Sequence, residues 1–168
     1  MSRDPYHILT EQYGEYLPRV LNYMRLRVDD EALAQDLTAQ TFERALTRLY
    51  ALRDEGAFGG WLFAIARTEV AGHYRRRKPQ VSLDNVDGLL ATDPSVEGRT
   101  ERRQELGALC TALSTLSERE QEIVRLKFVA GLTNRAIGKV MRLREGNVAV
   151  ILYRALRKLR SILDEREQ

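Results

Sequence analysis

The sequence predicts an all-α protein of two small helical domains joined by a flexible acidic linker. Apolar residues recur at helical spacing along most of the 168 residues, and no segment shows sustained strand alternation. The exception is the stretch from Gln80 to Gly98, which holds four carboxylates, two glycines and one proline but no Lys or Arg. We therefore expect one domain over residues 1–79, a linker over 80–99 and a second domain over 100–168.

The composition is that of a folded chain, because 43% hydrophobic residues allow two small cores. The net charge of +3, from 27 basic and 24 acidic residues, says little about the partners that the protein binds. No run has the length of a membrane span and the first ten residues lack the apolar centre of a signal peptide, which predicts a cytoplasmic protein. The single cysteine, Cys110, has no partner for an internal disulfide and is interpreted as a packed apolar residue.

Nothing in the sequence predicts catalysis. His7 and His73 do not have metal-ligand spacing with Cys110, and the glycines near residue 60 are followed by no Lys-Ser/Thr of a phosphate-binding loop. We therefore expect a protein that is not an enzyme, has no catalytic residues and uses neither metal nor cofactor.

Three helices are expected in the first domain. The first covers about Pro5 to Val28, and Asp29 or Asp30 can cap the second, which runs from Glu31 to Leu49. Its expected inner stripe is Leu33, Leu37, Phe42, Ala45, Leu46 and Leu49. A loop with three glycines is expected from Ala51 to Gly60, followed by a third helix that starts at Trp61, carries Trp61, Leu62, Ile65, Ala66 and Val70 at helical spacing, and stops at Pro79.

The second domain is predicted to end in a helix-turn-helix. Helical spacing resumes from about Thr100 to Leu116, and Ser117 with Glu120 forms a capping box for a helix that ends near Gly131. Thr133 caps a short helix, and Met141 to Arg144 forms the turn. The last helix starts near Glu145, and its expected buried residues are Val148, Leu152, Ala155, Leu156 and Leu159.

Charge distinguishes this segment from a generic helical hairpin, which would explain the apolar spacing equally well. From Arg135 to Arg160 there are eight Lys or Arg residues and one Glu. A helix with such a face fits the major groove of DNA, which is wide enough for a helix and has negatively charged walls. The segment therefore favours DNA binding.

A second basic cluster closes the third helix, at Arg75, Arg76, Arg77 and Lys78. The same helix carries Arg67 and His73, and aromatic residues lie close to it in the sequence, namely Phe58, Trp61, Phe63 and Tyr74. Basic and aromatic residues together suit single-stranded nucleic acid, because cations hold phosphates and rings stack on exposed bases. A solvated helix end beside core aromatics would look the same.

Three segments together resemble RNA polymerase sigma factors of the extracytoplasmic function (ECF) group of the sigma-70 family, over about Tyr13 to Leu163. DDEALAQDLTAQTFERALTRLY resembles the helix that binds the polymerase clamp, and GAFGGWLFAIARTEVAGHYRRRK resembles the segment that melts and reads the minus-ten element. LSEREQEIVRLKFVAGLTNRAIGKVMRLREGNVAVILYRALRKLR resembles the domain that binds the minus-thirty-five element. The resemblance implies a sigma factor that binds core polymerase and directs promoter-specific initiation, including melting.

The resemblance also implies site residues. Core polymerase would contact Asp36, Gln40 and Glu43. Minus-ten DNA would contact Arg53, Asp54, Glu55, Phe58, Trp61, Arg67, Arg75 and Arg76, with residues 53–55 offered to a flipped base. Minus-thirty-five DNA would contact Arg142, Arg144, Asn147, Arg154, Arg157 and Lys158, with Asn147 best placed to read a base edge. Promoter DNA, both duplex and melted, and core polymerase are the implied partners, and an anti-sigma factor is a further one.

One departure from the family concerns the recognition helix, where Ala149, Val150 and Ile151 replace polar or basic residues. We expect sparse hydrogen-bond readout there, and more dependence on phosphates and groove shape. Two alternative hypotheses are a stand-alone helix-turn-helix regulator of the response-regulator output type and a protein-interaction module that sequesters a partner. Such a regulator would not need the Gly56–Lys78 segment or the acidic linker.

Linker length supplies a mechanical expectation. The two promoter elements lie about two duplex turns apart, roughly 70 Å. A free coil of about 20 residues averages only ~25 Å between its ends, although it reaches roughly 70 Å when fully extended. The polymerase is therefore expected to hold the linker stretched, with Asp84, Asp87, Asp93 and Glu97 suited to a basic channel. An ordinary solvated linker is the other interpretation.

Overall fold

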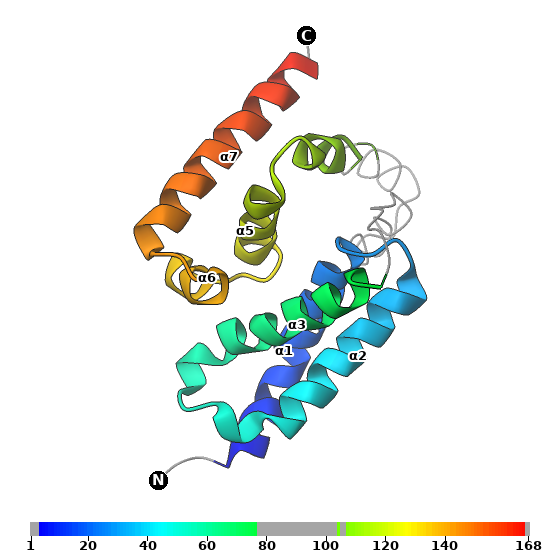
Figure 1. The fold of residues 1–168 in the computed structure, drawn as a ribbon, viewed down its shortest axis with the longest axis vertical. Coiled ribbons are helices and arrows are strands. Elements are labelled where there is room, and N and C mark those ends of the chain that lie inside the picture. The colour runs from blue at the N-terminus through cyan, green and yellow to red at the C-terminus, as the bar shows by residue number, and fades with distance from the viewer. Residues whose placement is uncertain (1–3, 77–103, 105–106, 167–168) are drawn as a thin grey trace.

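The fold is all-α throughout the part of the chain that the computed structural model describes, residues 4–76, 104 and 107–166 (Figure 1). Two groups of helices make up this part. Residues 4–76 form what we call the N-terminal lobe and residues 107–166 the C-terminal lobe. The expected linker over 80–99, its four acidic residues, and Arg77, Lys78 and Pro79 lie outside the described residues.

The first two helices begin at aspartate caps, as their sequences predict. Helix α1 spans Pro5–Arg25 and its N-cap is Asp4, whose side chain accepts a hydrogen bond from the backbone of the first turn. Helix α2 spans Glu31–Thr47 and its N-cap is Asp30. A short 3₁₀ turn, Leu49–Ala51, then leads away from α2.

Helix α3 spans Phe58–Tyr74 and starts earlier than its glycines predicted. A 3₁₀ turn at Glu55–Ala57 precedes it, so that Gly59 and Gly60 lie inside the helix instead of in the expected loop. Close packing explains Gly59, because a Cβ there would lie 2.6 Å from the Tyr16 hydroxyl oxygen. The glycine therefore provides close approach between segments, and it does not break the helix.

The C-terminal lobe contains the predicted helix-turn-helix. Residues 107–114 are helical, and α5 spans Glu118–Phe128 with the capping box between Ser117 and Glu120 in place. Helix α6 spans Asn134–Met141 behind its Thr133 cap, and α7 spans Glu145–Arg166. The expected caps and the start of the last helix are thus confirmed.

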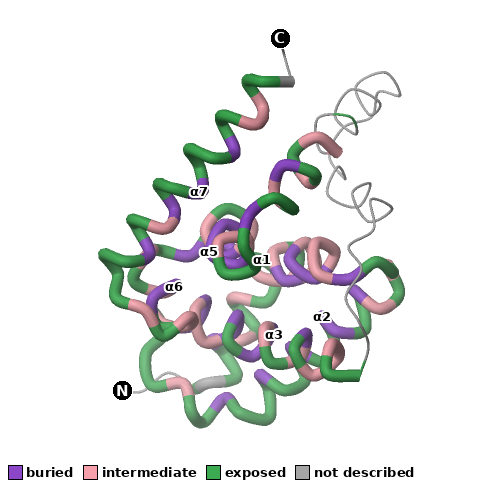
Figure 2. The backbone as a smooth tube through the Cα atoms, turned by 45° about the horizontal axis from the view of Figure 1, so that its top comes forward, coloured by how far each residue is buried: buried purple, intermediate pink, exposed green. Residues whose placement is uncertain are grey.

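Buried apolar residues run through both lobes and across their junction (Figure 2). Two expected core residues are corrections, since Leu46 is 44% exposed and Leu156 is 43% exposed. Each follows a fully buried alanine, Ala45 or Ala155, and the next residue on a helix is turned about 100° away from the core. Cys110 is half-buried, and burial raises the pKa of its thiol, as expected for a packed side chain.

The two lobes pack directly against each other, with α6 on α3 (Figure 1). Leu132 and Ala136 of the C-terminal lobe lie against Gly59 and Gly60 of α3. Helix α2 lies on the far side of the N-terminal lobe from α6 and α7. None of the described helices is long and apolar enough to cross a membrane.

Candidate nucleic-acid and polymerase interface

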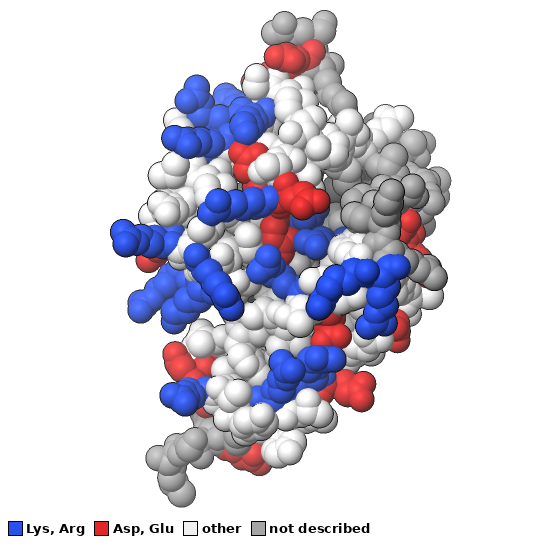
Figure 3. All heavy atoms as spheres, in the orientation of Figure 1, with Lys and Arg blue, Asp and Glu red and all other residues white. Residues whose placement is uncertain are grey.

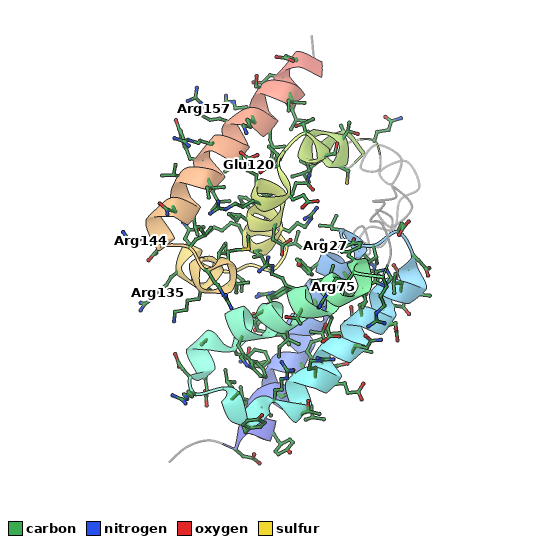
Figure 4. All side chains as sticks on the ribbon, in the orientation of Figure 1. Arg27, Arg75, Glu120, Arg135, Arg144 and Arg157 are labelled. Carbon is green, nitrogen blue, oxygen red and sulfur yellow. The ribbon has the colours of Figure 1, made fainter. Side chains whose placement is uncertain are left out.

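The outer side of α7 and the turn before it carry a basic surface (Figure 3). Asn147, Arg154 and Arg157 are exposed on α7, while Val148 and Leu152 face the core. Arg144 and Arg157 project away from the rest of the lobe (Figure 4). The helix therefore separates a buried apolar side from a solvent-facing side that carries the predicted duplex contacts.

The turn between α6 and α7 is held in a special backbone conformation. Arg142 is its C-cap and adopts a left-handed conformation, with φ 56° and ψ 46°. Leu143 then donates a backbone hydrogen bond of 2.7 Å to the Gly138 carbonyl oxygen. This geometry leaves both Arg142 and Arg144 exposed at the start of α7.

Two of the predicted duplex contacts already have internal partners. Lys158 donates to Glu120 at 2.7 Å, a contact that joins α7 to α5. The Arg157 guanidinium lies 5.8 Å from the centre of the Tyr153 ring. Lys158 is thus partly engaged within the lobe, whereas Arg154 has no such ion pair among the described residues.

The apolar stretch of the recognition helix divides between surface and core. Ala149 and Val150 are exposed, and Val150 is 48% exposed, but Ile151 is packed against the core. Ile151 is therefore explained by packing alone. The expected lack of hydrogen bonds to bases therefore applies only to Ala149 and Val150, whose side chains offer only apolar contact.

The predicted base-capture segment is exposed and lies close to α6. Arg53, Asp54 and Glu55 are all exposed, although the Asp54 carboxylate already accepts from the Gly56 backbone at 3.0 Å. A cleft of about 470 Å³ separates this segment from α6. Its lining includes Asp54, Trp61, Arg135 and Lys139.

The aromatic residues of α3 belong mainly to the core. Phe58 is 1% exposed and packs edge-on against Tyr16, with ring centres 5.2 Å apart. The prediction that Phe58 contacts minus-ten DNA is corrected on this ground, since its ring is buried by α1. Trp61 is half-buried and borders the cleft, so its ring keeps an accessible edge.

The predicted strand-binding arginines differ in their surroundings. Arg75 and Arg76 are exposed at the end of α3. Arg67 instead donates from Nε to Glu122 Oε1 at 3.0 Å and from Nη1 to the Val140 carbonyl oxygen at 3.2 Å. Both acceptors belong to the C-terminal lobe, so Arg67 joins the lobes.

Glu122 is a functional candidate that the sequence reasoning missed. It is 3% exposed, and it contacts Tyr23, Arg27, Arg67 and Arg125, a set that together with Glu122 we call the Glu122 cluster. The cluster borders an inter-lobe cleft of about 730 Å³. Arg27 and Arg75 both line this cleft (Figure 4). A sequence signal existed, because Glu122 stands one helical turn before the buried Leu126 on the core side of α5.

The predicted polymerase-binding residues form an exposed polar face on α2. Asp36, Gln40 and Glu43 are all exposed, and Gln40 donates to Asp36 at 2.8 Å. A hollow of about 360 Å³ beside them is also lined by Arg44 and Glu69, which pair at 2.6 Å between α2 and α3. This ion pair links α2 to α3, the helix that carries the predicted strand-binding arginines.

Two family models match the chain in the order that the lobes have. The model described as Sigma-70 region 2 matches residues 12–80, and the model described as Sigma-70, region 4 matches residues 106–159. An all-helical pair of lobes with a basic helix-turn-helix and a second basic segment defines a two-site nucleic-acid-binding protein. The chain belongs to the ECF group of the sigma-70 family of RNA polymerase sigma factors.

Curated relatives and solved structures agree with this family. The chain is 34% identical over 156 residues to the ECF RNA polymerase sigma factor BldN of Streptomyces coelicolor, covering 91% of this chain and 59% of the relative. It is 25% identical to the ECF sigma factor SigM of Bacillus subtilis, covering 92% and 94%. The fold is similar to that of the sigma factor RpoE from Bartonella quintana, solved with the anti-sigma factor NepR, with a TM-score of 0.70, 21% identity and coverage of 93% and 96%.

Proposed function

We propose that this chain binds core RNA polymerase and directs promoter-specific transcription initiation, with residues 1–79 acting on polymerase and the minus-ten element and residues 100–168 acting on the minus-thirty-five element. The observation that carries this proposal is the pairing of the two sigma-70 regions, in order, with two separate basic surfaces. Residues 80–99 would connect the two domains across the polymerase. The proposed place of action is the bacterial cytoplasm, where polymerase and promoter meet.

The duplex is proposed to meet α7. Arg142, Arg144, Arg154 and Arg157 would hold phosphates, and Asn147 would reach a base edge. Since Ala149 and Val150 supply only apolar contact, phosphate contacts and groove shape would provide much of the binding. Lys158 would contribute after it leaves Glu120.

The melted minus-ten strand is proposed to run along α3 and the turn before it. Arg67, Arg75 and Arg76 would hold phosphates, Trp61 would stack on a base, and residues 53–55 would receive a flipped base. Binding energy alone would drive the opening of the minus-ten duplex. The opened strand is stabilised because it gains contacts that the closed duplex lacks.

Core polymerase is proposed to contact Asp36, Gln40 and Glu43 through basic residues of its clamp. An anti-sigma factor is a further proposed partner. The support for it is the similarity in fold to the sigma factor RpoE, which was solved with the anti-sigma factor NepR.

Run-off transcription with purified bacterial core polymerase tests the proposal. We expect the full chain to confer initiation on promoters recovered from transcripts that its overexpression induces. Joint replacement Arg75→Ala and Arg76→Ala should reduce open-complex formation more than polymerase binding, while Arg160→Ala, at the far end of α7, is the control for loss of an exposed arginine outside α3. Equal loss of melting and polymerase binding would contradict the assigned role of α3.

A further inference from the structure

The Glu122 cluster joins the two lobes through one carboxylate. Glu122 projects from α5 and accepts from the Tyr23 hydroxyl at 2.6 Å and from Arg67 Nε at 3.0 Å, both on Oε1. On Oε2 it accepts from Arg27 at 2.5 Å, and from Arg125 of its own helix at 3.4 Å. Three of the four partners therefore belong to the N-terminal lobe.

This arrangement depends on the lobes being together. The Glu122 side chain is only 4% exposed in the closed arrangement, so its charge is taken out of water there and needs its hydroxyl and guanidinium partners as compensation. Tyr23 is fully buried, and burial first, then the nearby carboxylate, raises the pKa of its phenol, which keeps the hydroxyl proton available to donate. The contacts of Glu122 with Tyr23, Arg27 and Arg67 exist only across the junction.

The cluster is also rich in positive charge. Three guanidinium groups surround one carboxylate, and burial together with the nearby Arg27 lowers the pKa of Arg125. Without the negative charge at Glu122, the guanidinium groups of the two lobes would repel one another across the junction. Glu122 is thus the group on which electrostatic closure depends.

We propose that Glu122 acts as an internal competitor for promoter DNA, holding the free protein in a closed arrangement in which its carboxylate occupies the guanidinium group of Arg67. The inference rests on the proposed function for its consequence, since Arg67 is there a contact to a strand phosphate. A carboxylate and a phosphate oxygen are equivalent acceptors for a guanidinium, so the two cannot use Arg67 Nε together.

Geometry makes closure and promoter binding exclusive. In the closed arrangement α3 touches α6, and Arg67 Nη1 lies 3.2 Å from the Val140 carbonyl oxygen. On a promoter these two segments would serve elements roughly 70 Å apart. The Glu122 contacts with Tyr23, Arg27 and Arg67 therefore break before both elements are bound.

Pulsed electron paramagnetic resonance on the free full-length protein measures closure directly. Spin labels are placed at Tyr50→Cys and Ser161→Cys, both exposed and one in each lobe, after Cys110→Ser removes the native thiol. We expect a dominant narrow distance distribution for the otherwise unchanged protein, with at most about a tenth of the molecules at longer distances. Glu122→Gln should add a longer and broader population, because it removes the charge but keeps the shape.

Matched variants keep the test falsifiable if Glu122→Gln fails to fold, which circular dichroism would report. Tyr23→Phe removes only the hydroxyl that donates to Glu122 and should also lengthen the distances. Glu145→Gln neutralises an exposed carboxylate at the start of α7, outside the inter-lobe cleft, and should change nothing. Unchanged distances in both Glu122→Gln and Tyr23→Phe, or a broad distribution in the parent protein, would overturn the proposal.

A second measurement tests competition. A fluorescent 12-nucleotide thymidine oligonucleotide probes strand binding by the free protein, and Glu122→Gln should bind it up to about tenfold more tightly if about a tenth of the parent protein is open. Arg67→Gln in the Glu122→Gln background should lose most of this gain. Closure that disappears in Glu122→Gln without any gain in strand affinity would reject the competition while leaving run-off transcription, and hence the proposed function, intact.

Discussion

At the scale of single residues, two glycines beside the helix-turn-helix have opposite requirements. A Cβ at Gly138 would lie 2.7 Å from the Leu143 carbonyl oxygen, whereas a Cβ at Gly146 would meet nothing within 4 Å. We expect Gly138→Ala to lower the free energy of unfolding by about 1–3 kcal/mol, because backbone must move. Gly146→Ala should raise it by up to about 1 kcal/mol. Urea unfolding of the two variants compares them, and equal effects would mean that the turn is more yielding than its contacts indicate.

Arg142 combines backbone strain with a proposed contact. Its left-handed conformation is unfavourable for any residue with a Cβ, so Arg142→Gly should stabilise the fold by about 1 kcal/mol. The same change removes a cation that we propose faces duplex phosphate. The temperature of thermal unfolding should therefore rise in Arg142→Gly, while the affinity for duplex DNA falls. If Arg142→Gly lowers both the thermal stability and the duplex affinity, or raises both, one of the two roles assigned to Arg142 is wrong.

At the scale of elements, one contact joins helices α5 and α7 and responds to pH. Lys158 and the Ser117 backbone both donate to Glu120, and these hydrogen bonds lower the pKa of its carboxyl from the ordinary 4.5. The unfolded chain therefore takes up a proton first as pH falls. The stabilisation is complete above pH 4.5 and is lost as pH falls through the lowered folded pKa.

We expect Lys158→Met to reduce this pH dependence. Between about pH 5 and pH 3 the parent should lose more free energy of unfolding than the variant, by less than about 1 kcal/mol because the pair is near the surface. Arg160→Met, which alters the exposed pair with Asp164, is the matched control. Denaturant unfolding at a series of pH values measures the free energy of unfolding of each protein. If it falls with pH equally in the parent and in Lys158→Met, Lys158 does not cause the pH dependence.

Helix α7 makes its own prediction about salt. Each phosphate contact that is lost should reduce the slope of log affinity against log salt by about 1. Arg154→Gln and Arg157→Gln are therefore expected to flatten the salt dependence of binding to a nonspecific duplex. Arg48→Gln, an exposed arginine on the other lobe, should leave it unchanged. Steeper or equal slopes in the α7 variants would place the duplex elsewhere.

At the scale of the whole molecule, local signals predicted the helices well and their mutual arrangement poorly. Asp30, Ser117 and Thr133 were readable as caps because capping depends on a few neighbouring residues. Gly59 looked like a loop residue because its reason, the approach of Tyr16, comes from far away in the sequence. Phe58 looked like a stacking residue because its burial by α1 is likewise nonlocal.

The Glu122 cluster is the clearest case of this limit. Three of the four partners of Glu122 lie 55, 95 and 99 residues away in the chain, and one acidic residue on an amphipathic helix gives little indication of such a junction. The exposed residues of α2 were easier, because helical spacing alone decides which side chains face outward. Candidate sites that lie on a single helix could thus be predicted from the sequence, whereas a site formed by residues of both lobes could not.

The closed arrangement leaves the α2 face free while it occupies Arg67, which suggests that polymerase binds before the lobes part. Asp36→Arg should therefore weaken binding to core polymerase by about tenfold or more, since like charges would then meet at the clamp. Gln35→Arg, the neighbouring exposed position, is the control. Fluorescence anisotropy with labelled protein measures both. Equal weakening by the two variants would mean that net charge, and not the Asp36 face, governs the encounter, and the order of binding before opening would lose its structural basis.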